Sequence, residues 1–281
     1  MQIASPTAAR ADDGTAIAYR TRGTGPIDVL LMHGWGGSGA NFDEILKCVD
    51  LSGLRVTTVD LRGHGASDKP EGTYSLDRLA QDMLSVADAV GARRFVIVGY
   101  SMSAKFAQYV TCVAPDRVRG QVLVAGCPTG EIPFPVETHQ DWIGRAGDRE
   151  RLIELTRWFI TQPVEEDVLT RWADDAVLVP RAVLDESLTT CLRTSFVDCL
   201  TAGPPPTLVV GGLHDRSSLR RYCAMPSSLR SPARGWCYLT ATMRSRSSDR
   251  AKWPGCSRPS WLACSPNRSR IWLAPAGKNS G

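Results

Sequence analysis

The feature that most constrains this chain is a serine between a predicted strand and a predicted helix. Residues 94–99 (RFVIVG) form a nearly continuous apolar run rich in β-branched side chains, and residues 102–113 have helical spacing. The joining sequence, residues 99–103, reads GYSMS. Small residues two positions either side of Ser101 allow a strand and a helix to pass closely. The pattern predicts a sharp turn that projects the Ser101 hydroxyl above a sheet; a serine that only caps the helix is the alternative.

Apolar runs and amphipathic stretches alternate over residues 16–126. Nearly continuous apolar strands separated by helices are typical of a parallel sheet covered on both faces. The sequence therefore predicts an α/β fold with a doubly wound, mostly parallel sheet. Besides the run before Ser101, strands are predicted at residues 27–33, 55–60, 121–125 and 207–212, and a further helix at residues 75–90.

A helical insertion interrupts the predicted sheet. Residues 131–203 are amphipathic and carry tryptophans, with the sequence PFP near their start and PPP near their end. We expect these residues to form a lid. The expected organisation is a first part of the core at 1–130, the helical lid at 131–203, a core strand with its following turn at 204–215, and an atypical tail at 216–281.

The tail differs in composition from the rest of the chain. Residues 216–281 contain eleven Arg, two Lys and a single acid, Asp249, which gives a charge of +12 and leaves −8 for the remainder. Thirteen Ser, six Pro, four Trp and four Cys also lie there. A nucleic-acid-binding arm is one interpretation of so basic a segment. Scattered Trp and Cys are unusual in such arms, so we disfavour it.

A glycine-rich loop follows the first central strand. Residues 33–39 read HGWGGSG. A phosphate-binding loop is disfavoured because the GxGxxG spacing and a following Lys-Ser/Thr are both absent. A loop of small residues at the end of a strand instead exposes backbone NH groups to whatever lies above the sheet.

A third motif, DLRGHGASDKP at residues 60–70, completes a set. With HGWGGSG, DLRGHGASDKP and GYSMS in this order, residues 10–215 resemble the α/β-hydrolase superfamily, and most of all its lidded esterases related to cofactor-free haloperoxidases and perhydrolases. The resemblance implies a serine nucleophile that works without a cofactor or a metal. Aspartate stands at the nucleophile position in dehalogenases and epoxide hydrolases of this fold, so Ser101 argues against those reactions.

The resemblance also implies a role for individual residues. Ser101 would be the nucleophile, and the backbone NH groups of Trp35 and Met102 would hold the oxyanion. Asp215, which follows the strand at 207–212, would be the acid that orients a histidine. A turn or helix-capping aspartate is the other interpretation of Asp215, and Asp198 is a less favoured candidate for the acid.

No suitable histidine is present. In this family the triad histidine follows the acid in the chain, yet no histidine occurs after His214. His214 adjoins Asp215 and cannot easily lie between it and Ser101. The resemblance implies that His33 and His64 shape their loops through local hydrogen bonds, and His139 falls in the predicted lid. The predicted triad therefore lacks its base.

A shift of reading frame explains this loss. A shifted codon joins the last base of one codon to the first two bases of the next codon. In this frame the shifted codon between Thr242 and Met243 permits His, and the shifted codons that follow permit Glu-Ile-Pro-Ile-Glu-Arg-Pro. The same frame after Asp215 permits the usual continuation of the acid turn. We hypothesise a frameshift near Asp215, which would scramble the last strand, the histidine loop and the final helix.

These observations predict a carboxylic ester hydrolase acting on small uncharged or hydrophobic esters through an acyl-enzyme. Lactonase, perhydrolase and carbon–carbon hydrolase activities use the same residues, and a catalytically silent ligand-binding protein is the alternative from another class. We expect no nucleic-acid partner and no membrane span, and we expect a cytoplasmic location. The nine cysteines show no CxxC pair or regular spacing, so we interpret them as incidental thiols without a metal.

Overall fold

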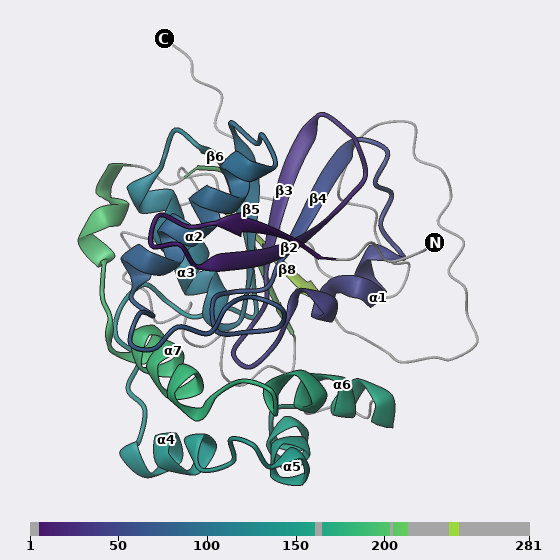
Figure 1. The fold of residues 1–281 in the computed structure, drawn as a ribbon. Coiled ribbons are helices and arrows are strands. Elements are labelled where there is room, and N and C mark those ends of the chain that lie inside the picture. Colours follow the sequence, from purple (N-terminus) through teal and green to yellow (C-terminus); the bar gives the residue numbers. More distant parts are fainter. Residues whose placement is uncertain (1–5, 161–164, 203–204, 213–235, 242–281) are drawn as a thin grey trace.

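A single eight-stranded sheet organises the computed structural model, which describes residues 6–160, 165–202, 205–212 and 236–241 (Figure 1). The strand order is β1-β2-β4-β3-β5-β6-β7-β8. The strands are β1 (Thr7–Arg10), β2 (Ala16–Arg22), β3 (Ile27–Met32), β4 (Leu54–Val59), β5 (Phe95–Tyr100), β6 (Val118–Val124), β7 (Thr207–Gly212) and β8 (Trp236–Ala241).

The sheet is mostly parallel, as the sequence predicts. Every pairing from β4 through β3 to β8 is parallel, whereas β1 pairs with β2 and β2 with β4 in antiparallel fashion. All five strands predicted from apolar runs are present. The pattern did not predict β1 and β2, because both mix apolar with charged or polar residues at the edge of the sheet.

Helices cover both faces of this sheet, which confirms the doubly wound arrangement. Alternate side chains of β3 separate into two cores, as the period of two in a strand requires. Leu30 and Met32 pack in the larger core, with α2 (Leu76–Ala89) and α3 (Met102–Val113). Leu31 packs on the opposite face beside Leu46 of the short helix α1 (Asp43–Leu46).

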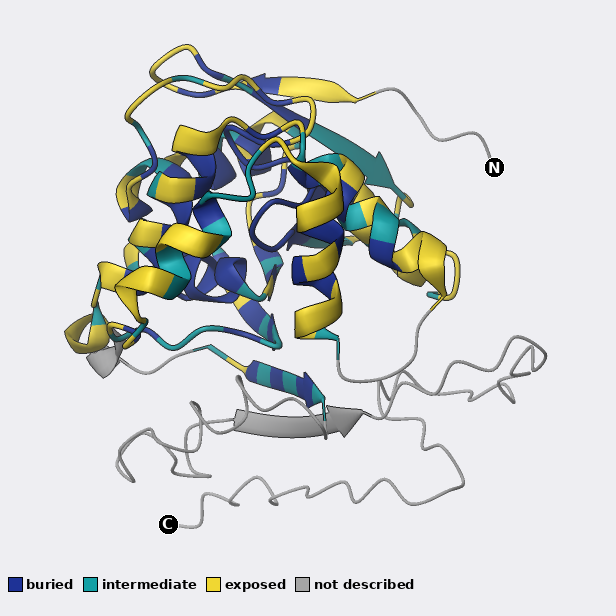
Figure 2. Cartoon of the chain, turned by 90° about the horizontal axis from the view of Figure 1, so that it is seen from below, coloured by how far each residue is buried: buried dark blue, intermediate teal, exposed yellow. Residues whose placement is uncertain are grey.

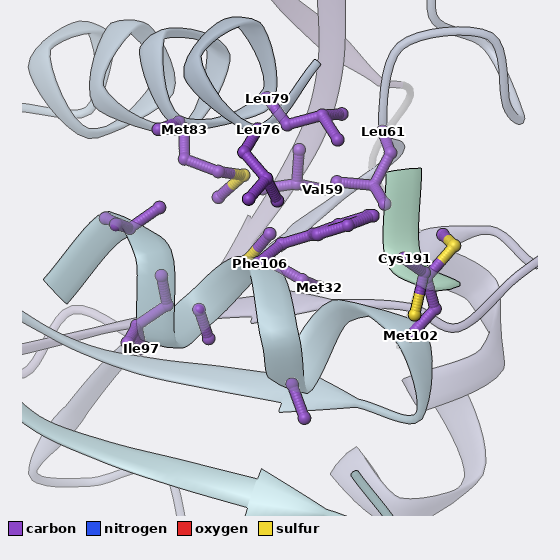
Figure 3. Packing of buried hydrophobic residues seen from close by; sticks show 14 of the residues in the cluster. Met32, Val59, Leu61, Leu76, Leu79, Met83, Ile97, Met102, Phe106 and Cys191 are labelled. Carbon is purple, nitrogen blue, oxygen red and sulfur yellow. The ribbon is translucent and has the colours of Figure 1, made fainter. Parts of the chain in front are cut away.

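The helix that follows Ser101 is held by the larger core. Phe106 of α3 is buried and lies among labelled side chains from β3, β4 and α2 (Figure 3). The predicted helix at 75–90 is α2, and Ser75 caps it by accepting a hydrogen bond from the Arg78 backbone NH. Packing on this side therefore fixes where α3 begins, and with it the position of Ser101.

Four helices between β6 and β7 form the segment for which we predicted a lid. They are α4 (Val136–Ile143), α5 (Arg149–Phe159), α6 (Glu166–Ala176) and α7 (Arg181–Arg193), followed by the 3-10 helix η2 (Val197–Ala202). They lie together at one end of the molecule (Figure 1). Their outward faces are exposed and their inward faces buried (Figure 2). The helical character is confirmed, and movement as a lid stays a prediction.

The last strand departs from our expectation for the tail. We expected a frameshift to scramble it, yet residues 236–241 form β8, which pairs in parallel with β7. The sequence WCYLTA combines aromatic, aliphatic and β-branched residues, which favour strands whatever their origin. In the part of the chain that the structure describes, no helix is long and apolar enough to cross a membrane.

Candidate active site

Ser101 lies in a sharp turn between β5 and α3. Its φ angle is 54° and its ψ angle −117°, a backbone conformation that non-glycine residues rarely adopt. The backbone NH of Ser101 donates to the Val124 carbonyl at 2.8 Å, so pairing with β6 continues to the last residue before the helix. Ser101 is half-buried. Strained backbone of this kind is concentrated at functional sites, where it holds a side chain in place.

The residues two positions before and after Ser101 are small for different reasons. A Cβ on Gly99 would lie 2.3 Å from the Ser103 carbonyl oxygen and 2.6 Å from the Ala104 Cα, so only glycine fits. Ser103 is completely buried and its hydroxyl donates to the His33 carbonyl. Sequence reasoning accounted for the size of Ser103 and missed this bond, which ties α3 to the glycine-rich loop.

The glycine-rich loop lies directly against the turn at Ser101. A Cβ on Gly34 would approach the Tyr100 ring at 3.1 Å and the Ser101 Cβ at 3.3 Å. Trp35 follows, and the hydrogen bonds of the described residues include none donated by its backbone NH. Met102 is the first residue of α3, where the helix provides no acceptor for a backbone NH. Of the two predicted donors, Met102 directly follows Ser101 in the chain, and Trp35 directly follows Gly34, which lies against Ser101.

Asp60 holds the third motif to the glycine-rich loop. Its carboxylate accepts from the Gly39 NH at 2.7 Å and from the Ala66 NH at 2.9 Å. A Cβ on Gly65 would lie 2.4 Å from the same carboxylate, which explains the glycine there. The motif at residues 60–70 therefore helps to fix the shape of the glycine-rich loop.

His33 is fixed in one tautomer by two hydrogen bonds. Its Nε2 accepts from the Leu61 backbone NH at 3.0 Å, which places the proton on Nδ1, and Nδ1 donates to the Gly34 carbonyl at 2.7 Å. Burial lowers the pKa of His33 to about 4. Both nitrogens are occupied, so His33 is a structural residue, as the resemblance implied.

His64 lies beside His33, with ring centroids 5.1 Å apart. Its Nδ1 is 3.0 Å from the Arg62 carbonyl, and its buried Nε2 has no hydrogen-bond partner among the described residues. Burial, helped by neighbouring His33, lowers the pKa of His64 to about 3. A neutral ring with a local hydrogen bond again matches the predicted structural role.

Tryptophans connect the glycine-rich loop to the helical insertion. The Trp35 indole NH donates to the Leu184 carbonyl of α7 at 2.8 Å, and the Trp172 indole NH of α6 donates to the Trp35 carbonyl at 2.9 Å. The Trp35 ring also lies 5.8 Å from that of Trp142 on α4. Three inserted helices therefore contact the residue predicted to hold an oxyanion.

His139 forms a pair within the insertion. Its Nε2 lies 2.7 Å from a carboxylate oxygen of Asp185, which joins α4 to α7. No described contact links His139 to Ser101. The candidate acid Asp198 lies exposed in η2, and the described hydrogen bonds and ion pairs do not include it.

The acid and the expected histidine position lie outside the described residues. This applies to His214 and Asp215 and to Thr242 and Met243. The strands that precede them are described. The strands β6, β7 and β8 are parallel, with Val124, Val210 and Leu239 in register. Their carboxyl ends therefore lie on the same side of the sheet as Ser101. The positions of the acid and of the missing histidine each follow such a strand end.

Lys105 is a feature of α3 that sequence reasoning missed. It is fully buried, and its ammonium donates to the carbonyls of Gly130 (2.9 Å), Cys191 (2.7 Å) and Thr194 (2.6 Å). Burial lowers the pKa of Lys105. A lysine four residues into a helix looks surface-exposed, so only its partners reveal that it binds the end of α7.

Metal ligands do not cluster in this region. Within the described ranges, no group of three or more His, Cys, Asp or Glu side chains is placed to hold a metal ion. The described region therefore combines a strained serine, a glycine-rich loop that lies against it, and inserted helices that contact Trp35 of that loop.

Known proteins are similar in sequence to this chain. Residues 29–159 match the family model described as alpha/beta hydrolase fold. A non-heme chloroperoxidase of Streptomyces lividans is 35% identical over 229 residues, which cover 73% of this chain and 80% of that protein. A non-heme haloperoxidase of Rhodococcus erythropolis is 28% identical over 226 residues, which cover 73% and 81%.

Solved structures agree on the fold. The esterase EaEST from Exiguobacterium antarcticum is similar with a TM-score of 0.72 and 20% identity, covering 84% of this chain and 90% of that one. At this level of identity the likeness concerns the fold alone.

Proposed function

Because the chain belongs to the α/β hydrolase fold family, we propose that it is built as a serine hydrolase of small carboxylic esters, with Ser101 as the nucleophile. The strained turn at Ser101, with a φ angle of 54°, is the observation that carries this proposal. A serine that only capped α3 would need no such backbone, and the Ser101 side chain makes no capping hydrogen bond.

In the proposed reaction the Ser101 oxygen attacks the ester carbonyl carbon, and the carbonyl oxygen becomes an oxyanion. The backbone NH groups of Trp35 and Met102 stabilise this charge as it develops. The alcohol then leaves, and water hydrolyses the acyl-enzyme to release the acid. Asp215 would orient the base that removes the Ser101 proton.

That base is the element the chain lacks. Among the described histidines, His33 has both nitrogens occupied, His64 is fully buried and His139 is paired with Asp185. Loss of a triad member lowers turnover by roughly 10⁴-fold to 10⁶-fold. We therefore expect the chain as written to be a greatly impaired enzyme.

The frameshift hypothesis accounts for the missing base. Thr242 and Met243, where the alternative frame permits His, directly follow the last residue of β8. In the predicted site this is the position from which a histidine would reach Asp215 and Ser101. An unambiguous in-frame read of the coding DNA across residues 210–220 would contradict a sequencing error as the origin.

Aromatic side chains beside the glycine-rich loop favour uncharged, apolar substrates. Trp35, Trp142 and Trp172 gather where the insertion meets the glycine-rich loop. Aromatic side chains of this kind bind apolar groups through their large surface. We propose small esters with apolar acyl or alcohol parts as substrates. Lactonase, perhydrolase and carbon–carbon hydrolase activities would use the same residues. We also propose a cytoplasmic protein that binds neither nucleic acid nor a membrane.

A catalytically silent ligand-binding protein is the second candidate. The occupied or buried histidines favour it, because the site would retain its shape without turnover. Hydrolysis of p-nitrophenyl acetate and butyrate separates the two candidates. The hydrolase proposal predicts a low rate that Ser101→Ala abolishes, whereas an equal background rate in both chains supports the silent candidate.

A further inference from the structure

Two contacts with matching spacing join α3 to the segment that follows α7. The Tyr109 and Phe196 rings meet edge to face, with centroids 5.1 Å apart. Three residues further along each segment, the thiols of Cys112 and Cys199 lie close enough to interact. Residues three apart lie on one face of an α-helix and of a 3-10 turn. The ring contact and the thiol contact therefore form one continuous seam.

Other bonds hold this seam in place without the thiols. The Phe196 backbone NH donates to the Thr129 carbonyl at 3.2 Å, and the Cys199 NH donates to the Phe196 carbonyl at 3.0 Å. Lys105 of α3 binds the Thr194 carbonyl at the start of the same segment. The backbone thus presents Cys199 to Cys112.

The two thiols differ in exposure. Cys199 is exposed and Cys112 is half-buried, and neither is part of a disulfide. Burial, with the neighbouring Cys199 thiol, raises the pKa of Cys112. A dissolved oxidant therefore reacts with Cys199 first, and the less exposed Cys112 thiol lies beside it.

We propose that Cys112 and Cys199 are a modification site that forms a reversible disulfide on exposure to a peroxide. The Cys199 sulfur takes one oxygen from hydrogen peroxide and becomes a sulfenic acid, and the other oxygen leaves as water. The Cys112 sulfur then displaces that hydroxyl as a second water while the S–S bond forms. Two thiols and one peroxide give one disulfide and two waters, and a dithiol reductant reverses the change.

The bond would join two structurally important segments. It would connect the helix that begins at Ser101 to the segment that leads into β7, and the closed loop would contain β6 and α4 to α7. The sequence alone did not suggest the pair, because the two cysteines lie far apart in the chain with no CxxC spacing. The inference does not rest on the proposed hydrolase activity.

Tryptic mapping of the full chain tests the site directly. Cleavage after Lys105, Arg117, Arg193 and Arg216 yields peptides 106–117 and 194–216, each with a single cysteine of the pair. The reduced protein is treated with stoichiometric hydrogen peroxide, alkylated and digested. We expect one linked species of these two peptides, lighter by two hydrogens than their sum and released by dithiothreitol.

Matched variants sharpen the result. Cys199→Ser and Cys112→Ser should each abolish the linked species, whereas Cys48→Ser, at another exposed cysteine, should leave its yield unchanged. The inference is overturned when Cys199 is oxidised alone while Cys112 stays alkylated. It is also overturned when disulfide links are spread over several cysteines. Both outcomes are read from the wild-type chain, so they do not depend on whether a variant folds.

Discussion

At Ser103, a single hydroxyl has a role that residue size alone does not indicate. The resembled family places glycine there, and the sequence predicted only that serine is small enough. The structure adds a hydrogen bond from this buried hydroxyl to the His33 carbonyl, beside the turn at Ser101. The roles of His33 and His64 in their loops, by contrast, were implied by the resemblance and are confirmed by their hydrogen bonds.

Ser103→Ala should therefore destabilise the chain, because it leaves a buried carbonyl without its donor. We expect a loss of about 1 to 3 kcal/mol in the free energy of unfolding, measured by urea denaturation. Ser195→Ala, at an exposed position, is the matched control and should change stability little. Equal effects in the two variants would show that the bond to His33 contributes nothing.

His33 gives the stability of the chain a defined pH dependence. Its pKa is about 4 in the folded protein, against an ordinary value of 6.5. Below pH 6.5 His33 binds a proton in the unfolded chain but stays neutral in the folded chain. The free energy of unfolding therefore falls as the pH drops toward 4. Between pH 7 and pH 5, His33 accounts for a loss of about 2 kcal/mol.

Urea denaturation at the two pH values measures this contribution. His33→Asn should be less stable than wild type at pH 7, but its further loss on going to pH 5 should be smaller by about 2 kcal/mol. The other titrating groups are common to both chains and cancel; His64, whose pKa is lowered mainly by its own burial, stays neutral over this pH range. The same pH-dependent loss in both chains would contradict a neutral, buried His33.

At the scale of elements, apolar strands and amphipathic helices were predictable and edge strands were not. The central strands β3 to β7 are covered on both faces and therefore appear as apolar runs. β1 has exposed positions, and most of β2 is only half-buried and polar, which breaks that pattern. Contacts between elements were less predictable still, because Lys105 and the cysteine pair depend on segments far apart in sequence.

Lys105 is the clearest such contact, since it joins α3 to the end of α7. Carbonyls at a helix end lack intrahelical partners, and a cation there is favourable. Lys105→Met keeps the length of the side chain but leaves three carbonyls unsatisfied. We expect a loss of about 3 kcal/mol in the free energy of unfolding.

Lys47→Met provides the control for that substitution. Lys47 is exposed and pairs only with Glu44, a kind of contact that contributes little. Urea denaturation should therefore show Lys47→Met to be close to wild type. If Lys105→Met is equally mild, the Lys105 ammonium adds nothing to the other contacts that hold α7.

At the scale of the whole molecule, the chain combines two parts of opposite character. The acidic first 215 residues contain the turn at Ser101, the glycine-rich loop and the candidate acid, whereas the tail has a charge of +12. The fold, the sharp turn at Ser101 and the loop against it were therefore predictable from the first part. The absence of a histidine after His214 could also be established from the sequence alone.

The turnover of p-nitrophenyl butyrate by a chain whose reading frame is restored after Asp215 tests the central claim most directly. We predict that kcat/KM rises by about 10⁴-fold or more over the chain as written, and that Ser101→Ala in the restored chain removes the gain. A restored, folded chain that is no more active than the original would contradict the account, as would a gain that persists without Ser101.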